Sequence, residues 1–159
     1  MNHVVAPRET TGLAYVVTRG NELSCVEISV SNAITIKQTM AVREAIAHLA
    51  CNADGRIVAV ACTDGSLHCY DVTSTSGFRK RWTMENVHSH VVSNIADSCS
   101  ESRDYAAGGA GPIRSLGFSK TNHLLVADSK LCTIRVYDAA SIAPTDTATS
   151  LKGIKVSSA

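Results

Sequence analysis

Four side chains that could do chemistry stand together in the stretch SLHCYDV, which runs from Ser66 to Val72. Histidine, cysteine, tyrosine and aspartate are residue types used in nucleophilic and general acid–base catalysis. Nothing in the sequence, however, places a cysteine at a helix N-terminus or beside a base, the settings that activate a thiol. Nor does it contain a Gly-x-Ser-x-Gly motif, a P-loop or a dinucleotide-binding fingerprint. We therefore expect a protein that is not an enzyme and has no cofactor.

A second group of chemically capable residues is the pair His88 and His90, with Cys99 following. These three side chains could ligate zinc, yet there is no Cys-x-x-Cys and no second close pair at the usual ligand spacing. A structural role for the histidines is the alternative. We expect no metal site.

Composition and charge limit the classes of partner. The chain has 159 residues, 45% hydrophobic and 18% charged, which predicts one globular domain, and its formal charge of +1 offers no general attraction for nucleic acid. The basic run from Arg79 to Arg81 leaves a nucleic-acid site as an alternative, although lysine and arginine commonly guard an exposed strand edge. The longest apolar run, Ile57 to Cys62, is too short to span a bilayer.

Two features of the sequence bear on the cellular location of the protein: its first residues and its cysteines. Its first residues lack the pattern of a secretory signal, and six cysteines without such a signal are expected to be reduced and mostly buried. We expect a cytoplasmic protein without a membrane segment, with the nucleus as the alternative.

The catalytic-looking stretch is one copy of a repeat. A shift of 67 positions lays residues 46–74 over 113–141 without a gap, so that Tyr70-Asp71 meets Tyr137-Asp138. A shift of 44 lays residues 14–28 over 58–72. The period is therefore 44, with an insertion between Met84 and Ile113.

Each repeat is expected to hold four short strands. In the middle copy these are residues 46–52, 56–62, 66–72 and 78–84, separated by turn signals such as Asn-Ala-Asp-Gly and Thr-Asp-Gly. Residues 42–50 alone could also form an amphipathic helix, but their equivalents begin with Gly-Pro and contain a central glycine, which disfavours helix.

Four strands per repeat and an Asp-Gly turn before a strand that ends in aromatic-Asp resemble the WD-repeat family of β-propellers. The resemblance implies an all-β fold of four-stranded antiparallel blades. It divides the chain into an incomplete first blade (13–43), a second blade (44–88), an inserted loop (89–112) and a third blade (113–156). It also implies structural roles for five residues, Asp64, Tyr70, Asp71, Tyr137 and Asp138. The family's hydrogen-bonded network is incomplete in the second blade, because Cys62 occupies its Ser/Thr position.

Three blades are too few for a closed ring. The first blade is expected to lack its opening strand, and an open stack would expose two apolar sheet faces. We therefore expect a partial propeller, or one completed by another chain or a second copy.

Propellers of this kind mostly bind proteins, so the resemblance implies a non-catalytic scaffold that assembles complexes. Residues 85–111, long for a loop, are the candidate contact segment. The candidate contacts in it are His88, His90, Arg103, Asp104 and Tyr105. The alternative function is a metal- or nucleic-acid-binding module built on the histidine pair or the basic strand.

Overall fold

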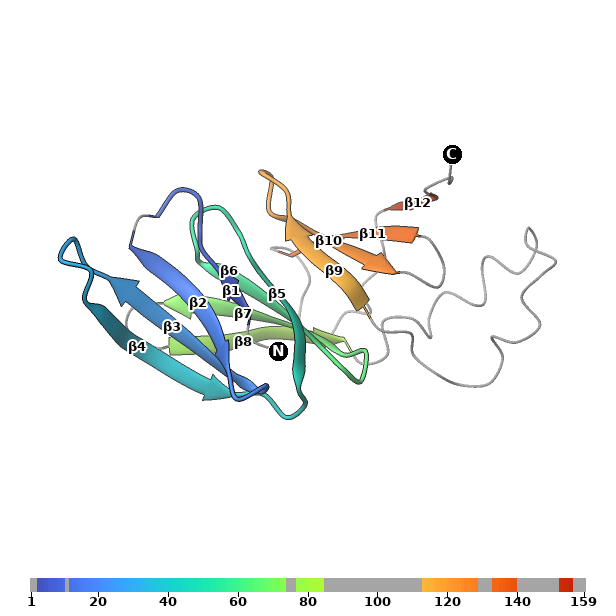
Figure 1. Cartoon of the computed structure of the whole chain (residues 1–159). Coiled ribbons are helices and arrows are strands. Elements are labelled where there is room, and N and C mark those ends of the chain that lie inside the picture. Colours follow the sequence, from blue (N-terminus) through green and yellow to red (C-terminus); the bar gives the residue numbers. More distant parts are fainter. Residues whose placement is uncertain are drawn as a thin grey trace.

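The computed structural model describes residues 3–10, 12–73, 77–84, 113–128, 133–139 and 152–155. Within these ranges the regular elements are twelve strands, which form three four-stranded sheets (Figure 1). All the strand pairs are antiparallel, as the sequence predicts. No helix in the described part of the chain has the length and apolar character needed to cross a membrane.

The strands of each sheet follow one another in chain order. The first sheet contains β1 (Val4–Val5), β2 (Leu13–Thr18), β3 (Glu22–Ile28) and β4 (Ile34–Ala41). The second contains β5 (Ile46–Cys51), β6 (Ile57–Cys62), β7 (Leu67–Thr73) and β8 (Gly77–Met84). The third contains β9 (Ile113–Phe118), β10 (His123–Asp128), β11 (Thr133–Asp138) and β12 (Lys152–Lys155). The four strands expected in the middle repeat are confirmed, and the helical alternative for residues 42–50 is wrong.

The expectation that the first unit lacks its opening strand is also wrong. A two-residue strand, β1, pairs Val4 with Val16 and Val5 with Tyr15. The segment after it crosses the turn that joins β5 to β6, where Glu9 N–H donates to the Ala53 carbonyl (2.9 Å). The strand is short because Pro7 lacks the N–H that a longer ladder would need.

The gapless alignment of the second and third repeats conceals a register difference. Val58 pairs with Tyr70 in the second sheet, whereas Leu124 pairs with Tyr137 in the third. Residues at equivalent places in the two sheets are therefore 67 positions apart in β7 and β11 but 66 positions apart in β6 and β10. Four residues separate β9 from β10, whereas five separate β5 from β6. On the other side of the strand, six residues lie between the paired Ala127 and Ile134, whereas five lie between the equivalent pair Ala61 and Leu67. A one-residue slip exchanges the two faces of a strand, so the sequence alignment assigned β10 the wrong face.

Two apolar layers hold the sheets together. The first seam, between the first and second sheets, includes Tyr15, Leu23, Cys25, Val58, Val60 and Tyr70. The second seam, between the second and third sheets, includes Ala59, Leu67, Cys69, Trp82, Leu124, Val126 and Tyr137. Alternate residues of the middle sheet thus enter opposite seams.

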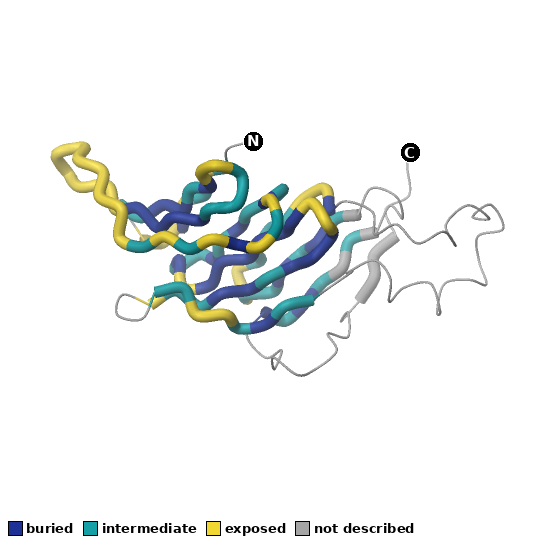
Figure 2. The backbone as a smooth tube through the Cα atoms, turned by 90° about the horizontal axis from the view of Figure 1, so that it is seen from below, coloured by how far each residue is buried: buried dark blue, intermediate teal, exposed yellow. Residues whose placement is uncertain are grey.

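Burial is deepest in the second strand of the middle sheet. Every residue of β6 is buried, as the dark blue strands in the interior of Figure 2 illustrate. The third strand of the middle sheet, β7, is covered on both faces, because Tyr70 lies in the first seam and Cys69 in the second. In β11 another described sheet covers one face only, and Ile134 and Val136 on the other face are half-buried.

Candidate interaction surfaces

The stretch SLHCYDV, through its Asp71, takes part in joining the second sheet to the third. A bulge in β8 leaves Arg81 as an extra residue, since Cys69 pairs with Trp82 and Tyr70 with Lys80. Arg81 Nε donates to Asp71 Oδ1 (2.8 Å), and another guanidinium nitrogen donates to the Ala139 carbonyl (3.2 Å). The bulge therefore aims a cation at the third sheet.

The same carbonyl receives a second bond across the seam. The indole N–H of Trp82 donates to the Ala139 carbonyl at 3.4 Å. A basic residue and the residue after it thus join β8 to the end of β11. Of the basic run expected to guard the strand edge, Arg79 and Lys80 are exposed, while Arg81 is engaged in this seam.

The first sheet repeats this arrangement 44 residues earlier. Lys37 forms an ion pair with Glu27 (2.5 Å) beside a bulge between Cys25 and Val26. The Gln38 side-chain amide donates to the Thr73 carbonyl of the second sheet (2.9 Å). The first and second sheets therefore share a carboxylate at the end of the third strand that is paired with a cation at a bulge of the fourth.

A groove of about 310 Å³ lies at one end of the strands of the second sheet, beside the turns that precede β6 and β10. Asn52, which is 2% exposed, binds Asn122 through its amide (3.0 Å) and accepts from the Ile57 N–H (2.9 Å). Arg56, Arg79 and Arg81 also line the groove, together with Asp54 and Asp71. Its described lining contains neither a histidine nor a cysteine, and the two carboxylates offset most of the positive charge.

A series of side-chain hydrogen bonds lies at the other end of the strands of the second sheet, at the start of β7. Ser66 donates to Asp64 Oδ1 through its N–H (2.9 Å) and its hydroxyl (2.7 Å). The Ser66 oxygen also lies 3.0 Å from His68 Nε2, and His68 Nδ1 lies 3.1 Å from the Thr83 hydroxyl. Because the serine proton is committed to Asp64, His68 Nε2 is assigned as the donor to Ser66. The histidine therefore does not act as a base toward Ser66.

This chain of bonds also determines the charge state of Asp64. Burial by itself would raise the pKa of the Asp64 carboxyl, but the hydrogen bonds from Ser66 and the nearby His68 outweigh it and lower the pKa. The carboxylate is an acceptor that fixes the turn. The predicted structural residue Asp64 thus lies in a network of Ser66, His68 and Thr83.

The described cysteines are protonated thiols in apolar surroundings. Burial raises the pKa of Cys51 and Cys62 to about 11 and that of Cys69 to about 12, and it raises the pKa of Cys25. All four are free thiols. A thiol of this kind is a poor nucleophile at neutral pH.

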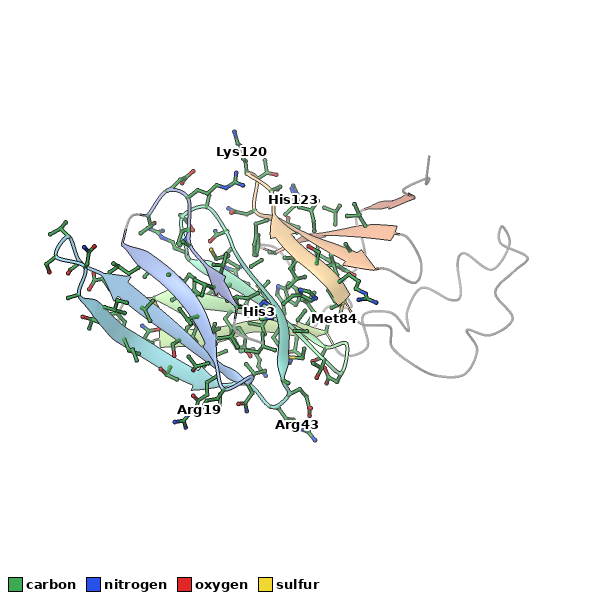
Figure 3. All side chains as sticks on the ribbon, in the orientation of Figure 1. His3, Arg19, Arg43, Met84, Lys120 and His123 are labelled. Atoms are coloured by element: carbon green, nitrogen blue, oxygen red, sulfur yellow. The ribbon has the colours of Figure 1, made fainter. Side chains whose placement is uncertain are left out.

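A histidine pair that the sequence did not suggest lies where the first strands of the sheets approach one another. The rings of His3 and His48 are 5.9 Å apart, and His3 is labelled between these strands in Figure 3. Burial lowers the pKa of His48, and the positive charges of His3 and Arg114 lower it further, against a hydrogen bond to the Ile113 backbone. The sequence pattern does not predict the contact between His3 and His48, because the contact depends on how the sheets are stacked.

The other predicted site residues occupy separate places. Tyr70 and Tyr137 are buried in different seams, and Asp71 and Asp138 are half-buried at the ends of β7 and β11. The candidate contacts His88, His90, Arg103, Asp104 and Tyr105 lie outside the described residues, as does Cys99. Among the residues that are described, no three or more histidine, cysteine, aspartate or glutamate side chains form a group that could hold a metal ion.

The outer face of the first sheet carries most of the large hydrophobic side chains that are exposed in the described ranges. Four aliphatic side chains on it are strongly exposed: Val4 (68%), Ile28 (41%), Ile34 (68%) and Ile36 (65%). Cross-strand partners share a face, and the pairs Val26–Ile36 and Ile28–Ile34 lie on the side opposite Leu23 and Cys25. We call the apolar residues on this side the outer apolar face: Val4, Ala14, Val16, Val26, Ile28, Ile34 and Ile36. Ala14 (4%) and Val26 (8%) are buried within it, and the hydrogen-bonded pair Ser24 and Thr39 lies on the same side.

The third sheet has a corresponding face on its far side, which no other described sheet covers and whose residues are half-buried. Leu125 pairs with Val136, and Ala127 with Ile134, on the side opposite Leu124 and Val126. We call these four residues the far apolar face. The described stack of three sheets therefore carries aliphatic residues on both outer sides, strongly exposed on the first sheet and half-buried on the third.

Comparison with solved structures places this arrangement among the β-propellers. No protein-family model and no curated protein matches the chain. A putative 6-phosphogluconolactonase from Bacteroides fragilis superimposes with a TM-score of 0.65 and 15% identity, over 97% of this chain and 38% of that one. The β-propeller domain of Myceliophthora thermophila Cps50 (Swd1) gives 0.65 and 9%, over 98% and 44%. Chaetomium thermophilum Sqt1 gives 0.66 and 18%, over 96% and 34%.

These likenesses concern the fold alone, because the sequence identities are low. The chain spans between about a third and under a half of the length of these proteins. Its three sheets correspond to blades, and they do not close on one another. The chain is thus an all-β protein with the fold of a partial β-propeller.

Proposed function

We propose that the chain is a non-catalytic, WD-type scaffold of the cytoplasm that assembles with other protein chains. The observation that supports this most directly is the outer apolar face, whose four strongly exposed aliphatic side chains lie on one side of one sheet. Contiguous apolar surface of this kind on a folded protein usually marks an interface. The unactivated thiols and the serine–histidine chain that runs in the wrong direction for catalysis argue for binding rather than chemistry.

The segment 85–111 is a second candidate contact region. It follows Met84, the last residue of β8. Because Met84 pairs with Leu67 at the start of β7, the segment begins at the same end of the strands as the Asp64 turn. The turns near Arg19 and Arg43 lie at the same end of the strands, because the Ile46 N–H donates to the Gly20 carbonyl and the Thr63 N–H to the Ala45 carbonyl. Figure 3 shows Lys120 and His123 at the opposite end from Arg19 and Arg43. A partner docked at that edge would meet several of the connecting loops at once.

Affinity capture with four matched baits tests this function. The baits are the unchanged chain, the double variant Ile34→Lys/Ile36→Lys, the control Val30→Lys at the tip of the β3–β4 hairpin, and a deletion of residues 91–110. We expect protein partners that persist with the Val30 control and are lost with the double variant or the deletion. Capture that is the same for all four baits, or an absence of any specific partner, would contradict the proposal.

A further inference from the structure

The outer apolar face and the far apolar face correspond to the two opposite sides of a blade, which in the stack pack against each other. The outer apolar face is equivalent to the side of the second sheet that the first sheet covers, since Val26 stands 44 positions before Tyr70 in the first seam. The far apolar face is equivalent to the side of the second sheet that the third sheet covers, since Val136 stands 67 positions after Cys69 in the second seam. The two faces would therefore meet if the stacking simply continued.

We propose that the occupant of each free face is the opposite face of a second copy of this chain. The inference rests on the proposed assembly function and names its partner. The far apolar face of one copy packs on the outer apolar face of the other, and the reverse contact closes the ring. Two copies give six blades, which lies within the range of four to eight in which propellers close, whereas three copies would exceed it.

Side-chain sizes support a match between the two faces. In the second seam, Ala59 and Tyr137 belong to one cluster, a small residue on one sheet and a large one on the next. In the proposed seam, Leu125 takes the position of Ala59, and Val26 takes that of Tyr137. The larger and smaller side chains have exchanged sides, so the volume between the sheets is roughly kept.

The first seam shows how far the pattern tolerates change. There the two equivalent positions are Tyr15 and Tyr70, and Tyr15 is accommodated by extending its hydroxyl to the Gly55 carbonyl. The proposed seam needs no such adjustment, because both of its residues are aliphatic. The exposed side chains Ile28, Ile34 and Ile36 would be covered in it.

Light scattering coupled to size-exclusion chromatography tests the proposal on the purified chain. We expect one species of twice the 16.8 kDa chain mass. Ile36→Lys should weaken the dimer at least about tenfold, because a cation would be buried unpaired in both seams of the ring. Val30→Lys is the matched control: Val30 is fully exposed on the same hairpin, and the change should leave the dimer intact.

A mixing experiment tests the head-to-tail arrangement. Val136→Lys alters the far apolar face and should also give monomers by itself. A mixture of Ile36→Lys and Val136→Lys chains keeps one intact pair of faces, so it should recover a weaker heterodimer. A dimer that is insensitive to Val136→Lys would overturn the head-to-tail arrangement.

Other outcomes are equally decisive. A monodisperse, folded monomer at micromolar concentration, or an assembly of three or more chains, would overturn the inference. If the single chain aggregates, two copies joined by a flexible linker should form one compact monomer, and a linked protein that still aggregates would count against the ring. A monomer that nevertheless captures another protein through Ile34 and Ile36 would leave the proposed function intact while removing the second copy.

Discussion

Gly55 is a residue whose backbone and surroundings both require the absence of a side chain. Its φ is +76°, and a Cβ there would lie 2.6 Å from Cγ of Pro7. Gly20 has a similar φ of +81° but nothing within 4 Å of the added atom. The two glycines therefore separate the cost of the backbone conformation from the cost of crowding.

We expect Gly20→Ala to lower the free energy of unfolding by about 1–2 kcal/mol, the usual cost of a left-handed conformation for a residue with a Cβ. Gly55→Ala should lower it by about 1–3 kcal/mol more, because the proline ring must move from the turn. Urea unfolding of the two variants measures the difference. Equal losses would show that the segment before β2 does not pack on this turn.

His48 should make the stability of the chain depend on pH. Its pKa in the folded chain is lowered from the ordinary 6.5, so in the pH range between the two values the unfolded chain binds more protons than the folded one. Stability is therefore complete above about pH 6.5 and falls as the pH drops through the lowered pKa. We expect His48→Gln to remove this loss. Urea unfolding at several pH values between 7.5 and 5 measures it, and an unchanged pH dependence in the variant would contradict the assignment.

The sequence predicted single residues well where their role is local. The Asp64 turn and the apolar character of the cysteines follow from neighbours in the chain, and the structure places them in a bonded turn and in the seams. It could not suggest the pair of His3 and His48, whose rings meet because three sheets converge. Long-range electrostatics of this kind has no signature in spacing.

At the level of elements, the bulge in β8 determines how strongly one sheet holds the next. Arg81 and Asp71 are 25% and 31% exposed, whereas the equivalent pair Lys37 and Glu27 is 48% and 52% exposed. Arg81 also donates to the third sheet. The same device thus lies within a seam in one repeat and on the surface in the other.

We expect Arg81→Met to destabilise the chain by about 2–3 kcal/mol, because Asp71 would lose its partner and the Ala139 carbonyl would lose a donor. The repeat-equivalent change Lys37→Met should cost at most about 1 kcal/mol, as is usual for an exposed ion pair. Lys80→Met, on the exposed side of β8, serves as the surface control. Thermal or urea unfolding provides the comparison, and equal effects at positions 37 and 81 would contradict a seam role for Arg81.

The register of β10 shows what an alignment of elements can miss. Two turns of changed length compensate one another, so the repeat slides into place without a gap, yet the strand between them is displaced by one residue. Small aliphatic residues fill both faces of these strands, so hydrophobic alternation could not reveal the slip. The strands of the middle sheet and their order followed from the repeat, whereas the short β1 and the assignment of faces in β10 required the pairing itself.

At the scale of the whole molecule, the three described blades form a stack in which the middle blade packs on the first through one seam and on the third through the other. In such a protein, stability is approximately a sum of blade and seam contributions. The middle blade has two seams, whereas in one copy each outer blade has one seam and one free apolar face. Local opening should therefore begin at the outer blades.

Hydrogen exchange at two protein concentrations can test this stack and its proposed closure together. In dilute solution we expect the amides of β6 to be protected most, and those of β3, β4 and β10 to exchange earlier through opening of the outer blades. At high concentration, a second copy that covers the outer and far apolar faces should slow exchange in β3, β4 and β10 and leave β6 nearly unchanged. The Ile36→Lys variant should show the dilute pattern at both concentrations. Protection that is uniform across the three blades would contradict the stack of independent seams, and protection that does not change with concentration would contradict closure by a second copy.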